Sequence, residues 1–203
     1  SGVWSFTPSS DLSEAAHPLH VTATDAAGNT SGNSNIRTIT IDLTAPSAPV
    51  IDSPATDVST TSVRPPIGGT AEANSEITVY DGATSIGTTT TDGSGNWSFT
   101  PSSDLSESAH AFHVTATDEA GNTSTDSNVR TITIDATAPD APVITTPSGN
   151  LTTSVNTQPI SGTAEANSTV TIYDGATQIG SAIADGSGNW SLAPDPTFTE
   201  GSH

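Results

Sequence analysis

The segment "RTITIDATAPDAPVI" (residues 130–144) indicates how the chain is organised, because it contains the end of one expected β-strand, a link and the start of another. Its first six residues alternate apolar and polar side chains, are rich in β-branched residues and end on Asp135, a pattern typical of a strand. Two prolines then stiffen a short link before the apolar end of the segment. A near copy, "RTITIDLTAPSAPVI", occupies residues 37–51, so the chain uses this arrangement twice.

The two copies are offset by 93 residues, and the same offset holds along the whole chain. Residues 1–44 match residues 94–137 at 35 of 44 positions without a gap. The three tryptophans, Trp4, Trp97 and Trp190, follow the same spacing, and each alternates with Phe or Leu along an expected strand, so we expect all three to be core residues. This period is too long for a helical or leucine-rich solenoid, and it has the size of one small β-sandwich domain.

Boundaries placed at the proline links divide the chain into the C-terminal part of one repeat, a complete repeat and the N-terminal two-thirds of a third, at residues 1–44, 45–137 and 138–203. Seven short strand-like runs separated by Asp, Asn and Gly turns are expected in the complete repeat, at residues 48–52, 64–71, 76–81, 84–91, 96–101, 111–118 and 128–135. No window of 11 or more residues shows helical periodicity. The sequence therefore predicts an all-β fold of tandem immunoglobulin-like, seven-stranded β-sandwiches joined end to end by short proline-containing linkers.

The composition excludes several classes of partner. Three basic residues stand against 22 acidic ones, for a formal net charge of −19, so we expect neither nucleic acid nor anionic lipid to bind. The chain has no cysteine, and it has no apolar run of about twenty residues, so neither a disulfide framework nor a membrane span is expected. Its first residues also lack the pattern of a signal peptide.

The repetition bears on catalysis as well. Most acidic groups have a near-identical copy in the next repeat, which indicates a structural role and not a single active site. No nucleophile elbow and no distinct pair of catalytic carboxylates occurs. We therefore expect a protein that is not an enzyme.

Four motifs in a fixed order carry a resemblance that covers the whole chain: "GTAEANSEITVYDG" (69–82), "DGSGNWSFTP" (92–101), "VTATDEAGNTS" (114–124) and "TIDATAPDAPVI" (133–144). They resemble the tandem bacterial Ig-like repeats of giant RTX-type, biofilm-associated surface adhesins exported by type I secretion. The resemblance implies an extracellular extender on the bacterial cell surface, a calcium-stiffened rod that projects a terminal binding domain for adhesion or biofilm formation. The glycine-rich nonapeptides of the RTX export region do not occur in the sequence, so the secretion route is implied by the resemblance alone.

Carboxylates at the expected domain junctions are candidate ligands for Ca²⁺. Alternating strands bring the loops of Glu72 and Asp118 to the end of the complete repeat that Asp42 reaches through the link at residues 43–46. Calcium takes six to eight oxygen ligands, so we expect these three carboxylates to bind one ion, with backbone carbonyls and Asn122 completing the shell. Further candidates are the start of the equivalent site at the next joint and the repeat counterpart of Asp118, namely Asp135, Glu165 and Asp25.

A simpler interpretation of the same residues stays open. Asp and Asn favour turns because their side chains hydrogen-bond nearby backbone, so these loops could be solvated acidic turns without an ion. The motif "DGSGNW" (92–97) is interpreted in this way, as a hairpin turn.

Two other functions and one further partner are also considered. The chain could be a ligand-binding Ig-like module for a carbohydrate or host protein, or a passive Ig-like spacer of a secreted polysaccharide-degrading enzyme. The expected partners are neighbouring repeats of the same chain. Because residues 138–203 lack the last two strands and residues 18–44 supply such a pair, head-to-tail completion of partial domains between chains is a further hypothesis.

Overall fold

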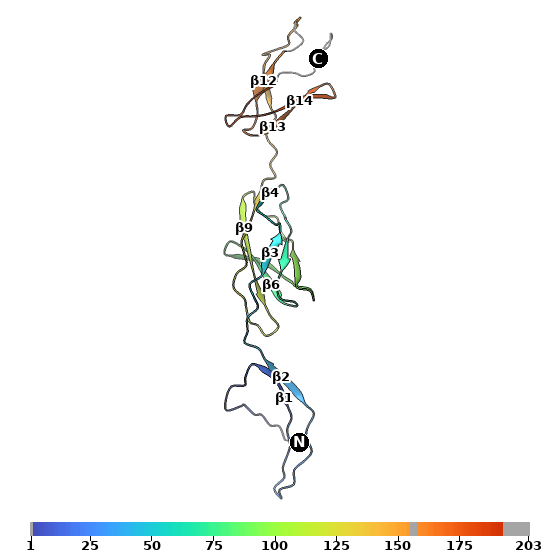
Figure 1. The fold of residues 1–203 in the computed structure, drawn as a ribbon, viewed down its shortest axis with the longest axis vertical. Coiled ribbons are helices and arrows are strands. Elements are labelled where there is room, and N and C mark those ends of the chain that lie inside the picture. Colours follow the sequence, from blue (N-terminus) through green and yellow to red (C-terminus); the bar gives the residue numbers. More distant parts are fainter. Residues whose placement is uncertain (1, 155–157, 193–203) are drawn as a thin grey trace. The chain divides into compact units, whose positions relative to one another are not determined.

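The computed structural model describes residues 2–154 and 158–192 of the chain, and these form fifteen β-strands and no helix (Figure 1). The described residues therefore contain no helix with the length and apolar character needed to cross a membrane. The chain divides into two compact units, residues 1–136 and 137–203. The all-β, immunoglobulin-like prediction is confirmed. The last eleven residues of the predicted C-terminal part, 193–203, lie outside the described residues.

The complete repeat is a sandwich of two sheets. The larger sheet has the strand order β4-β10-β9-β6-β7, formed by Val58–Thr60, Arg130–Ile134, Ala109–Thr117, Glu76–Asp81 and Thr84–Thr90. The smaller sheet has the order β3-β5-β8, formed by Val50–Ser53, Ile67–Thr70 and Asn96–Phe99. Each of the seven predicted runs overlaps one of these strands, with β3 ending one residue later and β9 beginning two residues earlier than predicted. The runs alternate apolar residues or are rich in β-branched ones, and turn signals separate them.

The eighth strand, β4, was not predicted from the sequence, so the complete repeat has one strand more than expected. It pairs in parallel with β10, with Ile132 opposite Val58 and Ile134 opposite Thr60. The chain thus leaves the smaller sheet after β3 and joins the larger one through β4. With a single apolar residue in three, β4 has no periodicity of its own, and its pairing with a strand more than 70 residues away defines it.

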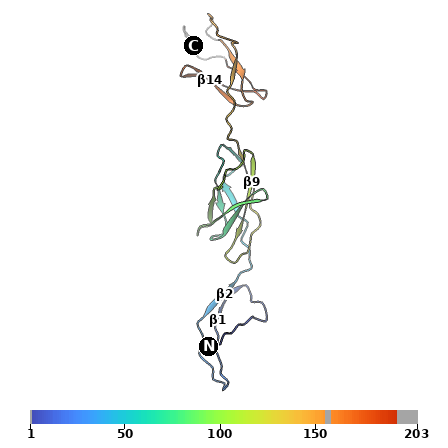
Figure 2. The same ribbon diagram turned by 180° about the vertical axis from the view of Figure 1, so that it is seen from behind.

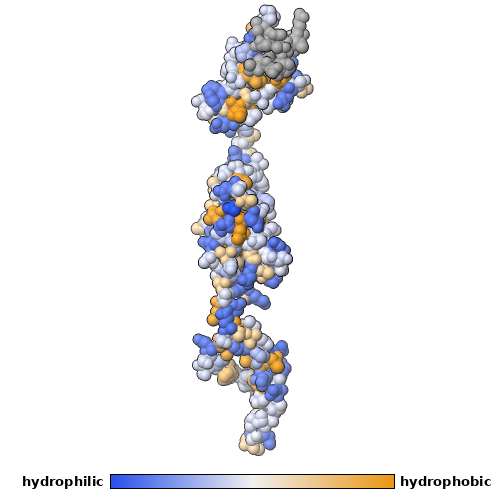
Figure 3. All heavy atoms as spheres, in the orientation of Figure 1, coloured by the Kyte–Doolittle hydropathy of each residue, from blue (hydrophilic) through white to orange (hydrophobic). Residues whose placement is uncertain are grey.

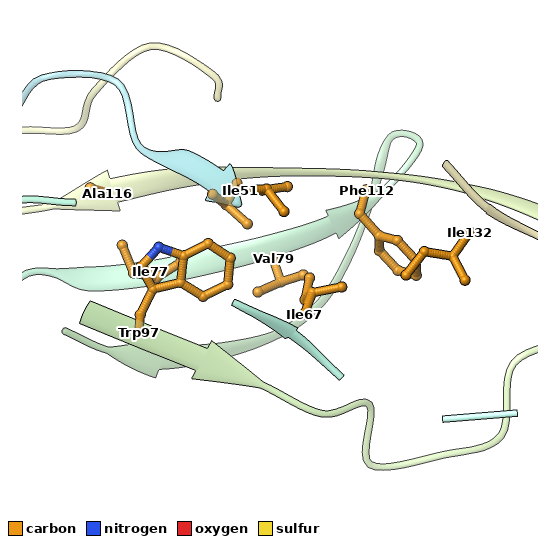
Figure 4. Close-up of a cluster of buried hydrophobic side chains, with 9 residues drawn as sticks. Ile51, Ile67, Ile77, Val79, Trp97, Phe112, Ala116 and Ile132 are labelled. Carbon is orange, nitrogen blue, oxygen red and sulfur yellow. The ribbon is translucent and has the colours of Figure 1, made fainter. Parts of the chain in front are cut away.

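Side chains from both sheets meet in the core of the complete repeat (Figure 4). Ile51, Ile67 and Trp97 point inward from the smaller sheet toward Val79 and Phe112 of the larger one. The prediction that Trp97 is a core residue is confirmed, and so is the same prediction for its counterpart Trp190. Burial of these side chains stabilises the sandwich, at about 1.5–3 kcal/mol for each large apolar residue.

Residues 2–44 form a smaller structure, whose only strands are β1 (Ala15–Leu19) and β2 (Arg37–Ile41). The two strands pair antiparallel with Ala16 opposite Thr40, which is the register of Ala109 and Thr133 in β9 and β10 shifted by the repeat length. Figure 1 and Figure 2 show them side by side from two directions. Trp4 was expected in a core, but it is exposed here, since β1 and β2 make a two-stranded sheet without a second sheet to cover it.

The C-terminal unit repeats the first part of the sandwich. One sheet has the order β11-β12-β15, formed by Val143–Thr146, Ile160–Thr163 and Asn189–Leu192, and the other pairs β13 (Thr169–Asp174) with β14 (Thr177–Ile183). Val170, Ile172, Ala184 and Trp190 form its small core. Its described residues thus hold counterparts of β3, β5, β6, β7 and β8.

Candidate functional site

The loop after β9 is built by Asp118 and Asn122. One carboxylate oxygen of Asp118, Oδ1, accepts a hydrogen bond from the backbone N–H of Asn122 at 2.8 Å, and Oδ2 accepts one from its side-chain Nδ2 at 2.9 Å. Gly121 permits the turn with a φ of 95°, in a region that favours glycine. The side-chain amide of Asn122, followed by backbone N–H groups of the loop, holds the pKa of Asp118 below its ordinary value. The sequence "DEAGN" is therefore a locally closed turn with a stabilised carboxylate.

The same asparagine reaches the link that enters the complete repeat. Its Nδ2 also donates to the backbone carbonyl oxygen of Asp42 at 3.1 Å, so one amide group bridges an oxygen of the link and an oxygen of Asp118. The carboxylate of Asp42 accepts the backbone N–H of Thr44 at 3.0 Å, and the hydroxyl of Thr44 donates to Glu14 at 2.5 Å. The structure therefore brings Asp42, Asp118 and Asn122 together at one place, which we call the joint cluster.

Glu72 lies at the same end of the larger sheet. Glu76, the first residue of β6, pairs with Thr117, the last residue of β9, so the loops before β6 and after β9 are neighbours. The carbonyl oxygen of Glu72 accepts hydrogen bonds from the hydroxyls of Ser75 and Thr91, both at 2.7 Å, while its side chain is exposed to solvent. The structure places Glu72 at the end of the domain that the sequence predicted. The hydrogen bonds of this loop, however, are made by the backbone carbonyl of Glu72 and not by its carboxylate.

The carboxylates of Asp42, Glu72 and Asp118 are not placed together around one possible ion position in this structure. Within the described residues, no group of three His, Cys, Asp or Glu side chains is placed to hold a metal ion. The physical reason is local hydrogen bonding, because the carboxylate of Asp118 accepts the N–H of Asn122 in the same loop and the carboxylate of Asp42 accepts the N–H of Thr44 two residues later. The calcium set remains a prediction.

The other predicted ligands lie at three different places in the repeats. Asp25 reproduces Asp118, with Oδ1 accepting the N–H of Asn29 at 2.8 Å and Oδ2 accepting its Nδ2 at 2.9 Å. Asp135 follows β10 and donates its N–H to the carbonyl of Thr60 at 3.0 Å. Glu165 accepts the hydroxyl of Ser168 through its carbonyl at 2.7 Å, and it belongs to the other compact unit.

The "DGSGNW" motif forms a tight turn, as predicted, but not a hairpin, because β7 before it and β8 after it belong to different sheets. Asp92 Oδ1 accepts backbone N–H groups of Ser94 and Asn96 at 2.8 and 2.9 Å, and Gly95 adopts a φ of 81°. Hydrogen bonds from the backbone and side chain of Asn96 lower the pKa of Asp92. As in the Asp118 turn, an asparagine four residues later donates both its backbone N–H and its side-chain amide to the aspartate, but here the amide has no contact with Asp42. The Asp92 turn is therefore a useful comparison for the joint cluster.

A partly buried histidine–aspartate pair was missed by the sequence analysis. His110, in β9, has Nδ1 2.6 Å from Oδ2 of Asp81, and its Nε2 lies 2.9 Å from the carbonyl of Ser106. Burial lowers the pKa of His110, but the hydrogen bonds to Ser106 and Asp81 and the charge of Asp81 outweigh it, and the pKa is raised above 6.5. The partners are 29 residues apart in the sequence, with no spacing signal to pair them.

His113 lies on the other face of β9 and stacks on Tyr80 with ring centroids 4.8 Å apart. His110 and His113 are three residues apart in β9 and therefore lie on opposite faces of the strand.

Comparison with known families adds the following findings. A sequence model described as "Bacterial Ig-like domain" matches residues 1–43 and 52–136, and one described as "Bacterial Ig domain" matches residues 138–203. A curated relative, Exoglucanase B of Cellulomonas fimi, is 30% identical over 196 residues, which are 87% of this chain and 17% of that protein. The chain thus spans less than a fifth of the length of this relative.

Three solved structures are similar to the chain. A tetra-tandem repeat from the extending region of a large adhesion protein is 22% identical with a TM-score of 0.38, over 94% of this chain and 51% of that one. The BSP domain of a biofilm-associated protein is 23% identical with a TM-score of 0.36, over 61% and 20%. The fibronectin(III)-like modules of Clostridium thermocellum CbhA are 21% identical with a TM-score of 0.42, over 70% and 75%.

Proposed function

The chain belongs to the bacterial Ig-like domain family, and from this premise we propose that it is an extender segment of a bacterial cell-surface adhesin. In this role, its repeats form a rod outside the cell that holds a terminal binding domain away from the surface for adhesion or biofilm formation. The observation that carries the proposal is the repeat itself, with 35 of 44 positions identical at a fixed offset and without a gap. Repetition of this kind extends one fold along the chain, which suits a spacing function.

The joint cluster supports a role for the link between repeats. Asp42 directly follows β2, and the complete repeat begins three residues later, at residue 45. The Asn122 amide holds the carbonyl of Asp42 against the loop after β9. An extender needs such contacts between neighbouring repeats, because the link alone does not fix the angle between them.

Calcium is part of the proposal, as the ion that stiffens the joint. The atoms that surround the Asn122 amide group are oxygens, the carbonyl of Asp42 and Oδ2 of Asp118, and such hard donors suit Ca²⁺. An amide nitrogen bridging two oxygens occupies the position that a cation would take between them. Rotation of this amide would turn its oxygen toward the ion, and the exposed carboxylate of Glu72 would approach from the neighbouring loop. Asp135 and Glu165 would act in the same way at the next joint.

The second candidate function is a passive Ig-like spacer in a secreted polysaccharide-degrading enzyme. The observation that favours it is the 30% identity to a segment of Exoglucanase B, over 87% of this chain. Both functions place the chain outside the cell and neither requires catalysis by it. The two functions differ in their need for calcium. A passive spacer does not require an ion that fixes the angle between its domains.

The test is thermal unfolding together with small-angle X-ray scattering of the 203-residue chain, first in EDTA and then across a calcium titration. Binding to the folded joint stabilises it by about 1.4 kcal/mol per site when free calcium is ten times the dissociation constant. For a domain of 60–100 residues this corresponds to a rise in Tm of about 6–11 °C. We also expect the maximum particle dimension to increase as the joint stiffens.

Two variants separate a joint ligand from a turn residue. Asp118→Asn should remove most of the calcium response, whereas Asp92→Asn should retain it, because Asp92 closes a similar turn without the contact to Asp42. Equal responses in both variants would show that calcium acts on acidic turns in general. No response in the unmodified chain would leave the passive spacer as the better proposal.

A further inference from the structure

His110 is the only buried ionisable side chain among the residues that the structure describes, at 7% exposed. Residues of low hydropathy, in blue and white, cover most of the face shown in Figure 3, so an ionisable group in the interior is an exception. The ring of His110 lies beside Phe112, with centroids 6.1 Å apart, and His110 is opposite Ile132 of β10. Figure 4 shows Phe112 and Ile132 at one end of the core, so His110 closes the core at that end.

Both ring nitrogens of His110 face oxygens that accept hydrogen bonds and do not donate them. Nδ1 is 2.6 Å from Oδ2 of Asp81, and Nε2 is 2.9 Å from the backbone carbonyl oxygen of Ser106. A neutral imidazole carries one N–H and can satisfy only one of these oxygens, whereas the protonated ring donates to both. The observed pair of contacts therefore belongs to the protonated ring.

Loss of the proton removes one of the two contacts. The hydrogen bond to the carboxylate of Asp81 is charge-assisted and the shorter of the two, so the remaining N–H stays on Nδ1. Nε2 then faces the carbonyl of Ser106 with a lone pair, and the hydroxyl of Ser108, 3.2 Å away, becomes its donor. Deprotonation thus replaces a bond to the backbone by a bond to a side chain.

Residues 106–108 form the loop before β9, which we call the entry loop, and it is attached on two sides. On one side His110 holds the carbonyl of Ser106. On the other side the carbonyl of Ser108 accepts the N–H of Ile134, the last residue of β10, at 2.9 Å. The contact of His110 with the entry loop is therefore connected to the end of β10, after which the chain leaves the complete repeat.

The equivalent loop of the preceding repeat holds the link. There Nε2 of His17 lies 2.8 Å from the carbonyl oxygen of Ser13, the same contact as in the complete repeat. The next residue, Glu14, accepts the hydroxyl of Thr44 in the link at 2.5 Å. Glu107 has the position of Glu14 in the complete repeat. The backbone that the histidine holds is thus adjacent to the carboxylate that holds the link.

We infer that His110 is a pH-dependent latch, whose protonated ring holds the entry loop and whose deprotonation releases this loop at the end of the repeat from which the link leaves. Burial favours the neutral ring, but the contacts with Ser106 and Asp81 outweigh it, so the pKa of His110 is raised above 6.5. The entry loop is therefore held below about pH 6.5 and is released as the pH rises through the raised pKa. The inference goes beyond the extender function and involves no ion, so it is tested in EDTA.

Asp81 of β6 is the charged group in direct contact with the ring. Asp52, the charged residue of β3, is exposed to solvent. The other charged residues on the elements around His110 have contacts of their own, namely Asp57 with the N–H of Thr131, Arg130 with the carbonyl of Pro54, Asp104 with Arg64, and Glu107 in the entry loop. The charge that favours protonation of His110 is therefore assigned to Asp81.

An NMR titration of the isotope-labelled 203-residue chain tests the latch. The imidazole nitrogen shifts of His110 report its protonation, and backbone order parameters report the entry loop. We expect order parameters of about 0.85 for residues 106–108 while His110 is protonated, and a fall below about 0.6 when it is neutral. The amide signal of Ile134 should shift with the same midpoint. The amide of Thr91, which donates to Ser75 at the other end of the larger sheet, should not shift.

Two outcomes would overturn the inference. Order parameters of the entry loop that stay near 0.85 after His110 has lost its proton would show that the ring does not hold the loop. A change at Thr91 as large as that at Ile134 would show a loosening of the whole domain and not a local release.

Two variants separate the latch from a general effect of pH. Asp81→Asn removes the charge that favours the protonated ring, so the pKa of His110 should fall, and the loss of loop order should move to lower pH with it. His113→Gln removes a histidine on the other face of β9 and should leave both midpoints unchanged. A loop midpoint that stays in place in Asp81→Asn while the pKa of His110 falls, or that moves in His113→Gln, contradicts control of the loop by His110.

Discussion

Replacing Asn128 with alanine should destabilise the complete repeat by about 2 kcal/mol. The Asn128 carboxamide accepts the N–H of Ile51 at 2.8 Å and donates to its carbonyl at 3.0 Å, which ties the segment before β10 to β3 of the other sheet. Each hydrogen bond contributes about 1 kcal/mol, and the cost rises toward about 3 kcal/mol for each group that stays buried without a partner. Ile51 is fully buried, so about 2 kcal/mol is close to the lower limit of the expected loss in unfolding free energy.

The assay is differential scanning calorimetry of the full chain, combined with hydrogen exchange of the Ile51 amide by NMR. For a domain of this size, about 2 kcal/mol lowers the Tm by about 8–16 °C. The Ile51 amide should also exchange faster in the variant, because its acceptor is gone.

The matched control is Asn35→Ala, which changes the same residue of the preceding repeat. Asn35 has no counterpart of β3 beside it in the described structure, so this variant should leave the main transition within about 0.5 kcal/mol of the unmodified chain. Equal unfolding temperatures for the two variants, or an unchanged exchange rate of the Ile51 amide, would refute the proposed contribution of the Asn128 hydrogen bonds.

Three other results are expected. The raised pKa of His110 contributes stability that is fully present below pH 6.5 and is lost as pH rises through the higher folded-state pKa, so unfolding midpoints should fall across this range more in the unmodified chain than in His110→Gln. Gly69→Ala should prevent correct pairing of β3 and β5, because its Cβ would meet a backbone carbonyl of β3, whereas Gly93→Ala has open space and should be tolerated in the same melt. Thr91→Val should cost about 1–3 kcal/mol in denaturant unfolding, since its buried hydroxyl bonds the loop before β6, while the exposed Thr90→Val should cost little.

Local patterns in the sequence predicted most of the fold. The alternation of Ile77 with Val79 and of Phe112 with Val114 defines strands by itself, and the Asp-Gly turns fix where they end. β4 could not be predicted in this way, because three residues with one apolar side chain become a strand only when β10 lies beside them. The exposure of Trp4 also depends on tertiary context, since its repeat counterpart is buried by a second sheet that residues 2–44 lack.

The candidate site was less predictable, because its geometry depends on competition between near and distant partners. The sequence placed Glu72 and Asp118 at one end of the domain, and the pairing of Glu76 with Thr117 agrees with this. It could not tell whether Asp118 turns to its own loop or to Asp42, and the structure shows the local choice, bridged by Asn122. The pairing of His110 with Asp81 likewise depends on strand neighbours that no spacing rule identifies.

The parallel pairing of β4 with β10 has a mechanical consequence. When a domain is pulled at its two ends, β4 is drawn toward its N-terminus and β10 toward its C-terminus, and in a parallel pair these directions are opposed along the strands. Tension therefore loads the hydrogen bonds between them in shear, together with the bond from Thr131 to Asp57 at 2.9 Å and the one from Asp135 to Thr60 at 3.0 Å. Bonds loaded in this way must break at the same time, and an antiparallel hairpin pulled at its open end would release its bonds one after another.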